Sequence, residues 1–284
     1  MRPMLLPGTH VLRRGPGRLQ AGLSPARSVA SADDRPDQLD HQALRAGLAL
    51  ADDRPLRDAL PALQEAPPWQ RHGLAALGRR HPDDLTEVLA RRRQHVVVVE
   101  PCGHALDARI VEDVDVVLGR AGLRRPGRVK PGPGPREKTT DVGLLLGVGE
   151  PQRERVDPWV RRGRPHLLLR WVEGEVLLGP FVLPGRTPCL RCLDAHRTEE
   201  DPSWPLLVEQ YARVSRLDRP DGVPEPVDPA LAALAVGWAV ADLATYAGGG
   251  RPTTLGATVR VTSGMEQIVT TRWRRHPACG CDWS

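Results

Sequence analysis

TPCLRC (residues 187–192) and HPACGC (residues 276–281) are the two stretches that decide how this chain folds. A CxxC and a CxC pair each place two thiolates on one tight turn, and two such turns supply a tetrahedral metal site. Because all four ligands come from the protein, such a site has no open position and is structural. We therefore predict a closed zinc site that pins the C-terminal residues to the core, formed by Cys189, Cys192, Cys279 and Cys281.

The same cysteines have other interpretations. Two disulfides would need an oxidising compartment, and nothing in the sequence indicates secretion. Four unrelated thiols are a further alternative. A redox CxxC pair would leave the distant CxC without a role. A closed zinc site can contribute on the order of 10 kcal/mol to folding.

The composition indicates a folded protein of 284 residues, with room for two small domains or one large one. The net charge is only +5, and acidic residues are interleaved with the arginines, so we expect no nucleic-acid partner. The N-terminus lacks the apolar region of a signal peptide, and no uninterrupted run of 18 apolar residues occurs. We therefore expect a cytoplasmic protein without a membrane span.

The sequence pattern predicts one small domain over residues 1–92. Glycines and prolines punctuate HVLRR (10–14) and RLQAGLS (18–24), which suits a hairpin. Helical spacing or helix-start signals then appear in three segments, 37–50, 56–64 and 81–93. Short strands mixed with short helices predict a winged-helix-like module.

Residues 93–284 read as a second, α/β domain. HVVVVE (95–100) is typical of a strand buried in a parallel sheet, and an amphipathic segment (104–123) follows after a tight turn. This is the opening of a Rossmann-like unit. A Pro/Gly linker at 124–141 takes the place of the second strand and helix, and DVGLLLGVGEP (141–151) is the next apolar strand.

The rest of this domain continues the α/β pattern. VDPWVRRG (156–163) predicts a short helical turn, and two strands follow, joined at Glu173-Gly174. The strongest helix covers 228–250, with Asp228 as cap and Pro229 at its first position. A last hairpin covers 257–273.

The segment GPFVLPGRTPCLRCLDAHR (179–197), with the late helix, the last hairpin and HPACGCDW, resembles the ThiF/MoeB family of ubiquitin-activating-like proteins. More narrowly, it resembles the actinobacterial branch called bacteriocin cyclodehydratase domain or azole-peptide (TOMM) precursor leader peptide-binding protein. The resemblance is close from about Gly179 onward and in outline before that. The opening LLPGTHVLRRGPGRLQAGLSPARSV (5–29) also resembles the start of these proteins. It implies a reduced Rossmann-like ThiF domain behind a winged-helix-like peptide-recognition module.

Active members of that family bind ATP at a GxGxxG turn and adenylate a C-terminal carboxylate. In this chain, Glu100, Cys102 and Ala105 stand where the three glycines belong. A carboxylate at the first position repels phosphate, so we expect neither ATP binding nor adenylation. Cys102 could be a nucleophile at a helix start or a small residue that fills a turn. We predict the inert role, because no base can be named.

Other polar residues near the cysteines have simple interpretations. His196 and His276 could donate hydrogen bonds to the metal ligands or replace one of them. More commonly, such histidines are solvated neighbours. The run RTEED (197–201) suits a solvated face, and Trp204 suits a packing anchor.

The resemblance implies a non-catalytic protein that binds the leader of a ribosomally made precursor peptide. It would present that peptide to a YcaO-type cyclodehydratase, which converts Cys, Ser or Thr to azolines. A homodimer is a further expectation. The alternative from another class is an ATP-dependent adenylyltransferase. A nucleic-acid binder using zinc knuckles is disfavoured by the mixed charge around the cysteines.

Overall fold

The computed structural model describes residues 11–15, 18–21, 30–31, 68–81, 84–103, 106–126, 140–214 and 225–281. The chain divides into two compact units, Met1–Ala90 and Arg91–Ser284.

The first unit contains a three-stranded antiparallel sheet with the order β1-β2-β3. Its strands are β1 (Val11–Gly15), β2 (Arg18–Ala21) and β3 (Ala30–Ser31). The predicted hairpin is confirmed, because β1 pairs with β2 in register Val11↔Ala21.

Two helices follow in the sequence, α3 (Pro68–Arg80) and α4 (Leu85–Arg93). Leu77, Leu85 and Val88 form a small apolar cluster. The helix predicted at 81–93 is confirmed as α4, whose three C-terminal arginines suit the negative end of the helix dipole. The segments 37–50 and 56–64 lie outside the described residues, so the winged-helix-like module stays a prediction.

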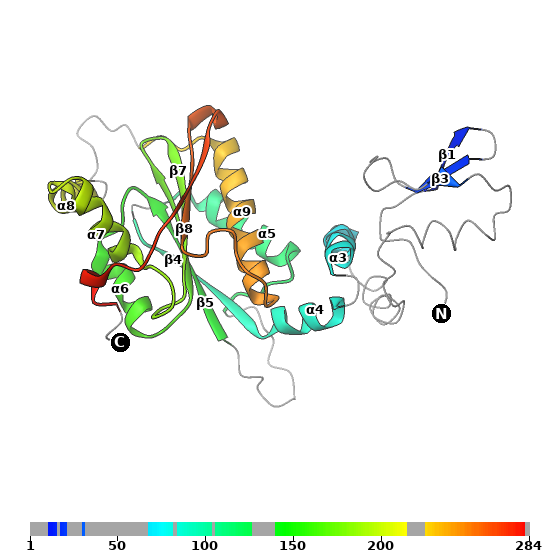
Figure 1. The fold of residues 1–284 in the computed structure, drawn as a ribbon, viewed down its shortest axis with the longest axis horizontal. Helices are drawn as coiled ribbons and strands as arrows, with labels where there is room; N and C mark the ends of the chain where they lie inside the picture. The colour runs from blue at the N-terminus through cyan, green and yellow to red at the C-terminus, as the bar shows by residue number, and fades with distance from the viewer. Residues whose placement is uncertain are drawn as a thin grey trace. The chain divides into compact units, whose positions relative to one another are not determined.

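The second unit contains a six-stranded sheet in chain order (Figure 1). Its first three strands are parallel and the remaining pairs are antiparallel. The predicted α/β class, Rossmann-like at its start, is thus confirmed. The strands are β4 (His95–Pro101), β5 (Thr140–Val148), β6 (His166–Val172), β7 (Glu175–Val182), β8 (Ala257–Val261) and β9 (Ile268–Arg272).

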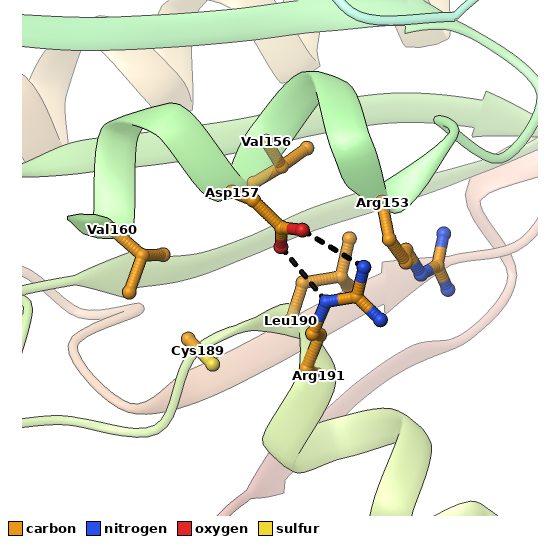
Figure 2. A pocket seen from close by; sticks show the side chains of 7 residues that line it. All are labelled: Arg153, Val156, Asp157, Val160, Cys189, Leu190 and Arg191. Atoms are coloured by element: carbon orange, nitrogen blue, oxygen red, sulfur yellow. Dashed lines mark hydrogen bonds and ion pairs between the residues drawn. The ribbon is translucent and has the colours of Figure 1, made fainter. Parts of the chain in front are cut away.

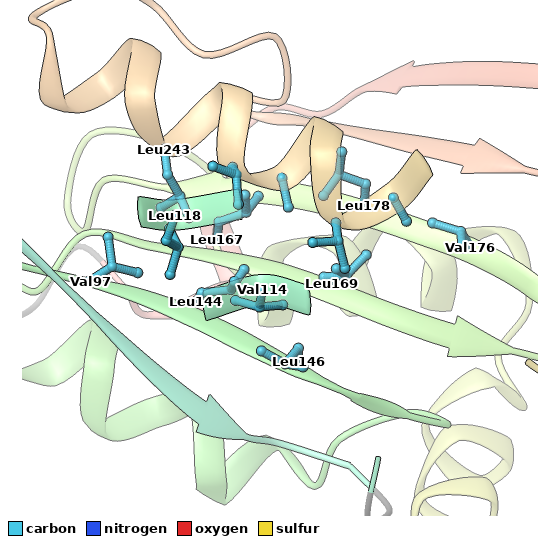
Figure 3. Close-up of a cluster of buried hydrophobic side chains, with 14 of the residues drawn as sticks. Val97, Val114, Leu118, Leu144, Leu146, Leu167, Leu169, Val176, Leu178 and Leu243 are labelled. Carbon is cyan, nitrogen blue, oxygen red and sulfur yellow. The ribbon is translucent and has the colours of Figure 1, made fainter. Parts of the chain in front are cut away.

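Helices cover both faces of this sheet (Figure 1). Side chains alternate along a strand, so Leu144 and Leu146 point to one face and Leu145 to the other. The first face packs against α5 (Ala108–Arg120) and α9 (Pro229–Ala247), as Figure 3 shows for the larger core. The second packs against α6 (Arg153–Arg161) and α7 (Leu190–Glu200), and α8 (Trp204–Val214) follows α7.

The helix predicted at 228–250 is confirmed as α9. The Asp228 side chain accepts a hydrogen bond from Leu231 N at 2.8 Å, and Pro229 opens the helix. By length and composition α9 could also cross a membrane, a test that buried core helices pass as well. In this structure, 56% of the 18-residue apolar stretch of α9 is buried within the protein.

The predicted hairpins are confirmed too. Glu173 and Gly174 join β6 to β7, and both have positive φ, 56° and 80°. Two such residues make a turn whose twist matches that of the flanking strands. The last hairpin is β8–β9, with the short helix η2 (Ser263–Met265) at its tip.

Candidate functional site

The four predicted cysteines converge at the start of α7. Cys189 caps this helix and Cys192 lies in its first turn, while Cys279 ends the short helix η3 (Pro277–Cys279). Gly280 has φ 71°, a left-handed conformation that lets CGC turn tightly enough to aim two sulfurs at one point. The second unit thereby brings residues about 90 positions apart into one cluster, as the two cysteine pairs in the sequence predicted.

The sulfur positions suit a tetrahedral ion. The Sγ–Sγ distances are 3.8 Å for Cys189–Cys192, 3.5 Å for Cys189–Cys279 and 3.5 Å for Cys192–Cys281. A Zn–S bond of about 2.3 Å gives a tetrahedron with edges of ~3.8 Å. A disulfide needs about 2.04 Å, so these are four separate thiols. Their chemistry and spacing fit zinc.

The charges of the cluster also suit a cation. A hydrogen bond with Cys189 lowers the pKa of Cys192 to about 4, whereas burial raises the pKa of Cys279 to about 12. Ionisation of all four thiols would place four like charges within 4.8 Å of one another, where they repel. A dication at the centre of the cluster would offset this repulsion by its own charge. Coordination to such an ion deprotonates thiols outright.

His196 and His276 pair with Glu199 beside the cysteines. Ala278 N donates to Nδ1 of His276 at 3.1 Å, so its Nε2 carries the proton and donates to Glu199 Oε1 at 2.9 Å. This bond lowers the pKa of Glu199. Nε2 of His196 lies 3.0 Å from the carbonyl oxygen of Arg274 and donates to it. The two histidines therefore fasten the C-terminal segment to α7, because each hydrogen bond joins a residue of this helix to a residue of that segment.

A second region of interest is the turn after β4, at the carboxyl ends of the parallel strands. Ligands of open α/β sheets bind at this edge. The Glu100 carboxylate accepts a hydrogen bond from Trp159 Nε1 at 2.9 Å. Cys102 is buried, and this burial raises the pKa of its thiol to about 12. A thiol held neutral in this way suits the inert role that the sequence predicted.

Gly103 packs directly against β5. A Cβ on Gly103 would collide with the carbonyl oxygen of Val148, and a Cβ on Gly147 would lie 2.5 Å from Gly103 N. The glycine that survives in this turn therefore serves contact between two stretches of backbone. It does not open space for a ligand on that side.

Next to this turn lies a buried ion network that the sequence analysis missed. Glu150 Oε1 accepts from Arg170 at 2.7 Å, and its Oε2 accepts from Arg153 at 2.8 Å. Arg153 also binds both carboxylate oxygens of Asp194 at 2.7 Å. Burial alone would raise the pKa of Glu150, but the two arginines hold it at about 2. One signal was available: Arg170 interrupts the apolar strand HLLLRWV.

Trp204 and Trp273 extend this network toward the surface. Trp204 Nε1 donates to Asp194 Oδ1 at 3.0 Å, which agrees with the predicted packing anchor. The Arg197 guanidinium lies 4.5 Å from the ring centroid of Trp204 and 5.8 Å from that of Trp273. Arg197, the first residue of the run RTEED that the sequence assigned to a solvated face, is thus half-buried between two indole rings.

A small crevice opens between α6 and the start of α7 (Figure 2). Its space for a water-sized molecule is only about 10 Å³, roughly the room that one water needs and far below the size of a small-molecule site. Arg191 forms two hydrogen bonds with Asp157, both at 2.8 Å, across its rim. The crevice is therefore too small for a small-molecule ligand. It is lined by Arg153, Val156, Asp157, Val160, Cys189, Leu190 and Arg191.

Comparison with known proteins shows similarity of fold only. No protein-family model matches the chain, and no curated protein matches it. Among solved structures, the heterocyclase TruD matches with 18% identity and a TM-score of 0.62, over 97% of this chain and 42% of that one. A heterocyclase in complex with substrate and cofactor matches with 17% identity and a TM-score of 0.61, over 98% and 40%.

A third neighbour is E. coli MccB in complex with AMPCPP and MccA, with 13% identity and a TM-score of 0.56, over 98% of this chain and 99% of that one. These neighbours agree with the resemblance to the ThiF/MoeB family, and the α/β unit has a Rossmann-like heterocyclase fold. The chain spans less than half the length of the two heterocyclases.

Proposed function

We propose that this protein is a non-catalytic subunit that binds a precursor leader peptide in the cytoplasm. It presents that peptide to a YcaO-type cyclodehydratase in the biosynthesis of azol(in)e natural products. The observation that carries this proposal is the turn after β4, where Glu100 replaces a glycine and Gly103 packs against Val148.

A phosphate cradle needs backbone N–H groups that point into open space, with no negative charge beside them. Here the first position carries a carboxylate, which is engaged by Trp159. The neighbouring Glu150 is held ionised by two buried arginines. These features favour a scaffold over a nucleotide-dependent enzyme.

The rival is an adenylyltransferase that acts on a C-terminal carboxylate. The fold shared with MccB, solved with AMPCPP, favours it. Adenylation needs a bound nucleotide, and the turn after β4, with Glu100 in place of a glycine, disfavours nucleotide binding. Binding of ATP therefore separates the two candidates.

Recognition of the leader would use the sheet of the first unit. Its outer strands β1 and β3 each pair on one side only with β2 among the described residues. An extended peptide can add to such an edge, with main-chain hydrogen bonds giving affinity and side-chain pockets giving specificity. Holding the leader raises the effective concentration of the core peptide at the cyclodehydratase. Zinc in the four-cysteine cluster would supply structural cross-linking only.

The test uses the full chain and the leader of a precursor peptide encoded beside its gene. Titration calorimetry should give micromolar affinity or better, and a scrambled leader of the same composition should not bind. Hydrogen exchange should slow in residues 11–31 when the leader is added. Azoline formation by the YcaO partner, followed as loss of one water per residue, should depend on this chain. Exchange protection confined to residues 93–284 would overturn the proposed recognition site.

A further inference from the structure

Arg197 on α7 is a cation without an anionic partner. Its guanidinium lies 4.5 Å from the ring centroid of Trp204 and 5.8 Å from that of Trp273. Among the described residues, no oxygen atom accepts a hydrogen bond from this side chain. Stacking on a ring uses the face of a guanidinium and leaves the N–H donors along its edges available. These donors are therefore open to a ligand.

The charges around Arg197 do not balance. Glu150 and Asp194 both bind Arg153, and Glu150 also binds Arg170, at distances of 2.7 to 2.8 Å. Three arginines thus share two carboxylates, and Arg197 is the one that binds neither. Burial and, after it, the charge of Arg170 lower the pKa of Arg197, which is the direction expected for an uncompensated cation.

The remaining acidic side chains near this end of α7 are engaged elsewhere. Glu199 accepts a hydrogen bond from His276 at 2.9 Å, and Asp201 accepts one from Ser203 N at 2.9 Å. On the other side of the network, Nε of Arg170 is buried and has no hydrogen-bond partner among the described residues. The surplus is therefore one of positive charge and of N–H donors.

The walls beside Arg197 are apolar. The indole N–H of Trp204 donates to Asp194, and that of Trp273 donates to Thr258, so both rings offer only carbon surface to a ligand. Leu207 lies one turn after Trp204 on the same side of α8 and is 49% exposed. An anion at Arg197 would thus have apolar groups around it, where its ion pair with the guanidinium is stronger than in water.

These features define the chemistry of the ligand. We propose that Arg197, with the indole rings of Trp204 and Trp273 beside it, binds the carboxylate of a peptide. A carboxylate is planar and accepts two parallel hydrogen bonds from one edge of a guanidinium. Its single negative charge matches the single unpaired positive charge. The phosphates of a nucleotide would bring more negative charge than one arginine offsets, next to the carboxylates of Glu150 and Asp194.

Two sources can supply this carboxylate, an acidic side chain with apolar neighbours or the C-terminus of a peptide. The exposed Leu207 favours a ligand that carries apolar side chains as well. The proposal is independent of leader binding by the first unit, because it rests on α7 and the residues around it. Failure of the leader to bind residues 11–31 would therefore leave it unchanged.

The test uses the full chain with isotope-labelled arginine and follows the Nε–H resonances by NMR. Three tripeptides serve as probes. N-acetyl-Leu-Glu-Leu amide carries a side-chain carboxylate, N-acetyl-Leu-Gln-Leu acid carries a terminal one, and N-acetyl-Leu-Gln-Leu amide carries none. We expect at least one charged peptide to shift the Arg197 resonance saturably and to bind about tenfold more tightly than the neutral peptide. The charged peptide that binds identifies the source.

Variants assign the effect to Arg197. Arg197→Gln should abolish the preference for a charged peptide. Arg197→Lys keeps the charge but loses the planar fork, so it should bind the charged peptide several-fold more weakly than wild type. Arg155→Gln is the matched control, because Arg155 on α6 is exposed and its loss changes the net charge equally. It should bind like wild type. Thermal unfolding verifies that each variant is folded.

Several results would overturn the proposal. One is a wild-type protein that binds charged and neutral peptides equally, or whose Arg197 resonance no peptide shifts up to about 10 millimolar. Another is a preference for charged peptides that persists in both Arg197 variants; if Arg197→Gln does not fold, Arg197→Lys decides. Inorganic phosphate that shifts the Arg197 resonance at lower concentration than either charged peptide would assign the site to phosphate instead.

Discussion

Gly103 and Val148 meet backbone to backbone, so closely that even a methyl group on Gly103 would overlap the Val148 carbonyl oxygen. The two residues lie at the carboxyl ends of the neighbouring parallel strands β4 and β5. In open α/β folds this edge receives the ligand. Here the turn is used to seat one strand end against the next.

Gly103→Ala should destabilise the second unit. The added methyl group meets backbone that cannot rotate away, and overpacking of this kind costs about 1–3 kcal/mol. Urea unfolding of wild type and variant measures the difference. Gly119→Ala is the matched control, because a Cβ there has nothing within 4 Å, and it should lose no stability. Equal effects of the two changes would show that Gly103 is not sterically confined.

The Glu150 carboxylate should make stability depend on acid pH. Its folded pKa is about 2, below the ordinary 4.5. A depressed carboxyl pKa contributes stability above the unfolded value, and this stability is lost as pH falls from 4.5 toward 2. The difference corresponds to about 3 kcal/mol. The free energy of unfolding, measured between pH 6 and 2, should therefore fall more steeply for wild type than for Glu150→Gln. If the free energy of unfolding falls equally with pH in wild type and in Glu150→Gln, the buried ion pairs of Glu150 do not contribute to stability.

Purified protein should hold about one equivalent of zinc through Cys189, Cys192, Cys279 and Cys281, because their sulfurs match a tetrahedral shell. Cys279→Ser should release the metal and loosen the C-terminal segment. Elemental analysis and thermal unfolding measure both effects. Cys102→Ser is the control, since this cysteine lies outside the cluster, and it should keep its zinc. Full retention of zinc in Cys279→Ser would refute the assignment.

ATP binding should be undetectable at millimolar concentration. The reason is the carboxylate of Glu100 at the phosphate turn, together with the closed contact of Gly103. Titration calorimetry with ATP and magnesium tests this directly. Micromolar affinity, or pyrophosphate exchange that depends on a peptide carboxylate, would restore the adenylyltransferase hypothesis.

Much of the α/β unit could be predicted from local sequence. Runs of β-branched and leucine residues predicted β4 and β5, and the Asp228-Pro229 start predicted α9. These signals are local, because a strand or a helix is specified by the spacing of its own apolar residues. The cysteine pairs likewise predicted their own convergence, since each thiol pair needs a second one to complete a closed site.

The sequence by itself thus determined the strands of the α/β unit, the helices α4, α5 and α9, the four-cysteine cluster and the loss of the glycine motif, but it did not predict the helices α3, α7 and α8. Only the tertiary structure decided that Glu150 meets Arg170 and Arg153, and that β9 is an open edge. The ion network joins residues from β6, α6 and the segment after β5, so its geometry depends on strand register and on which face each helix covers. Strand order, in turn, is set by backbone pairing between segments far apart in the chain. No local spacing encodes that pairing, because every strand offers the same N–H and C=O groups.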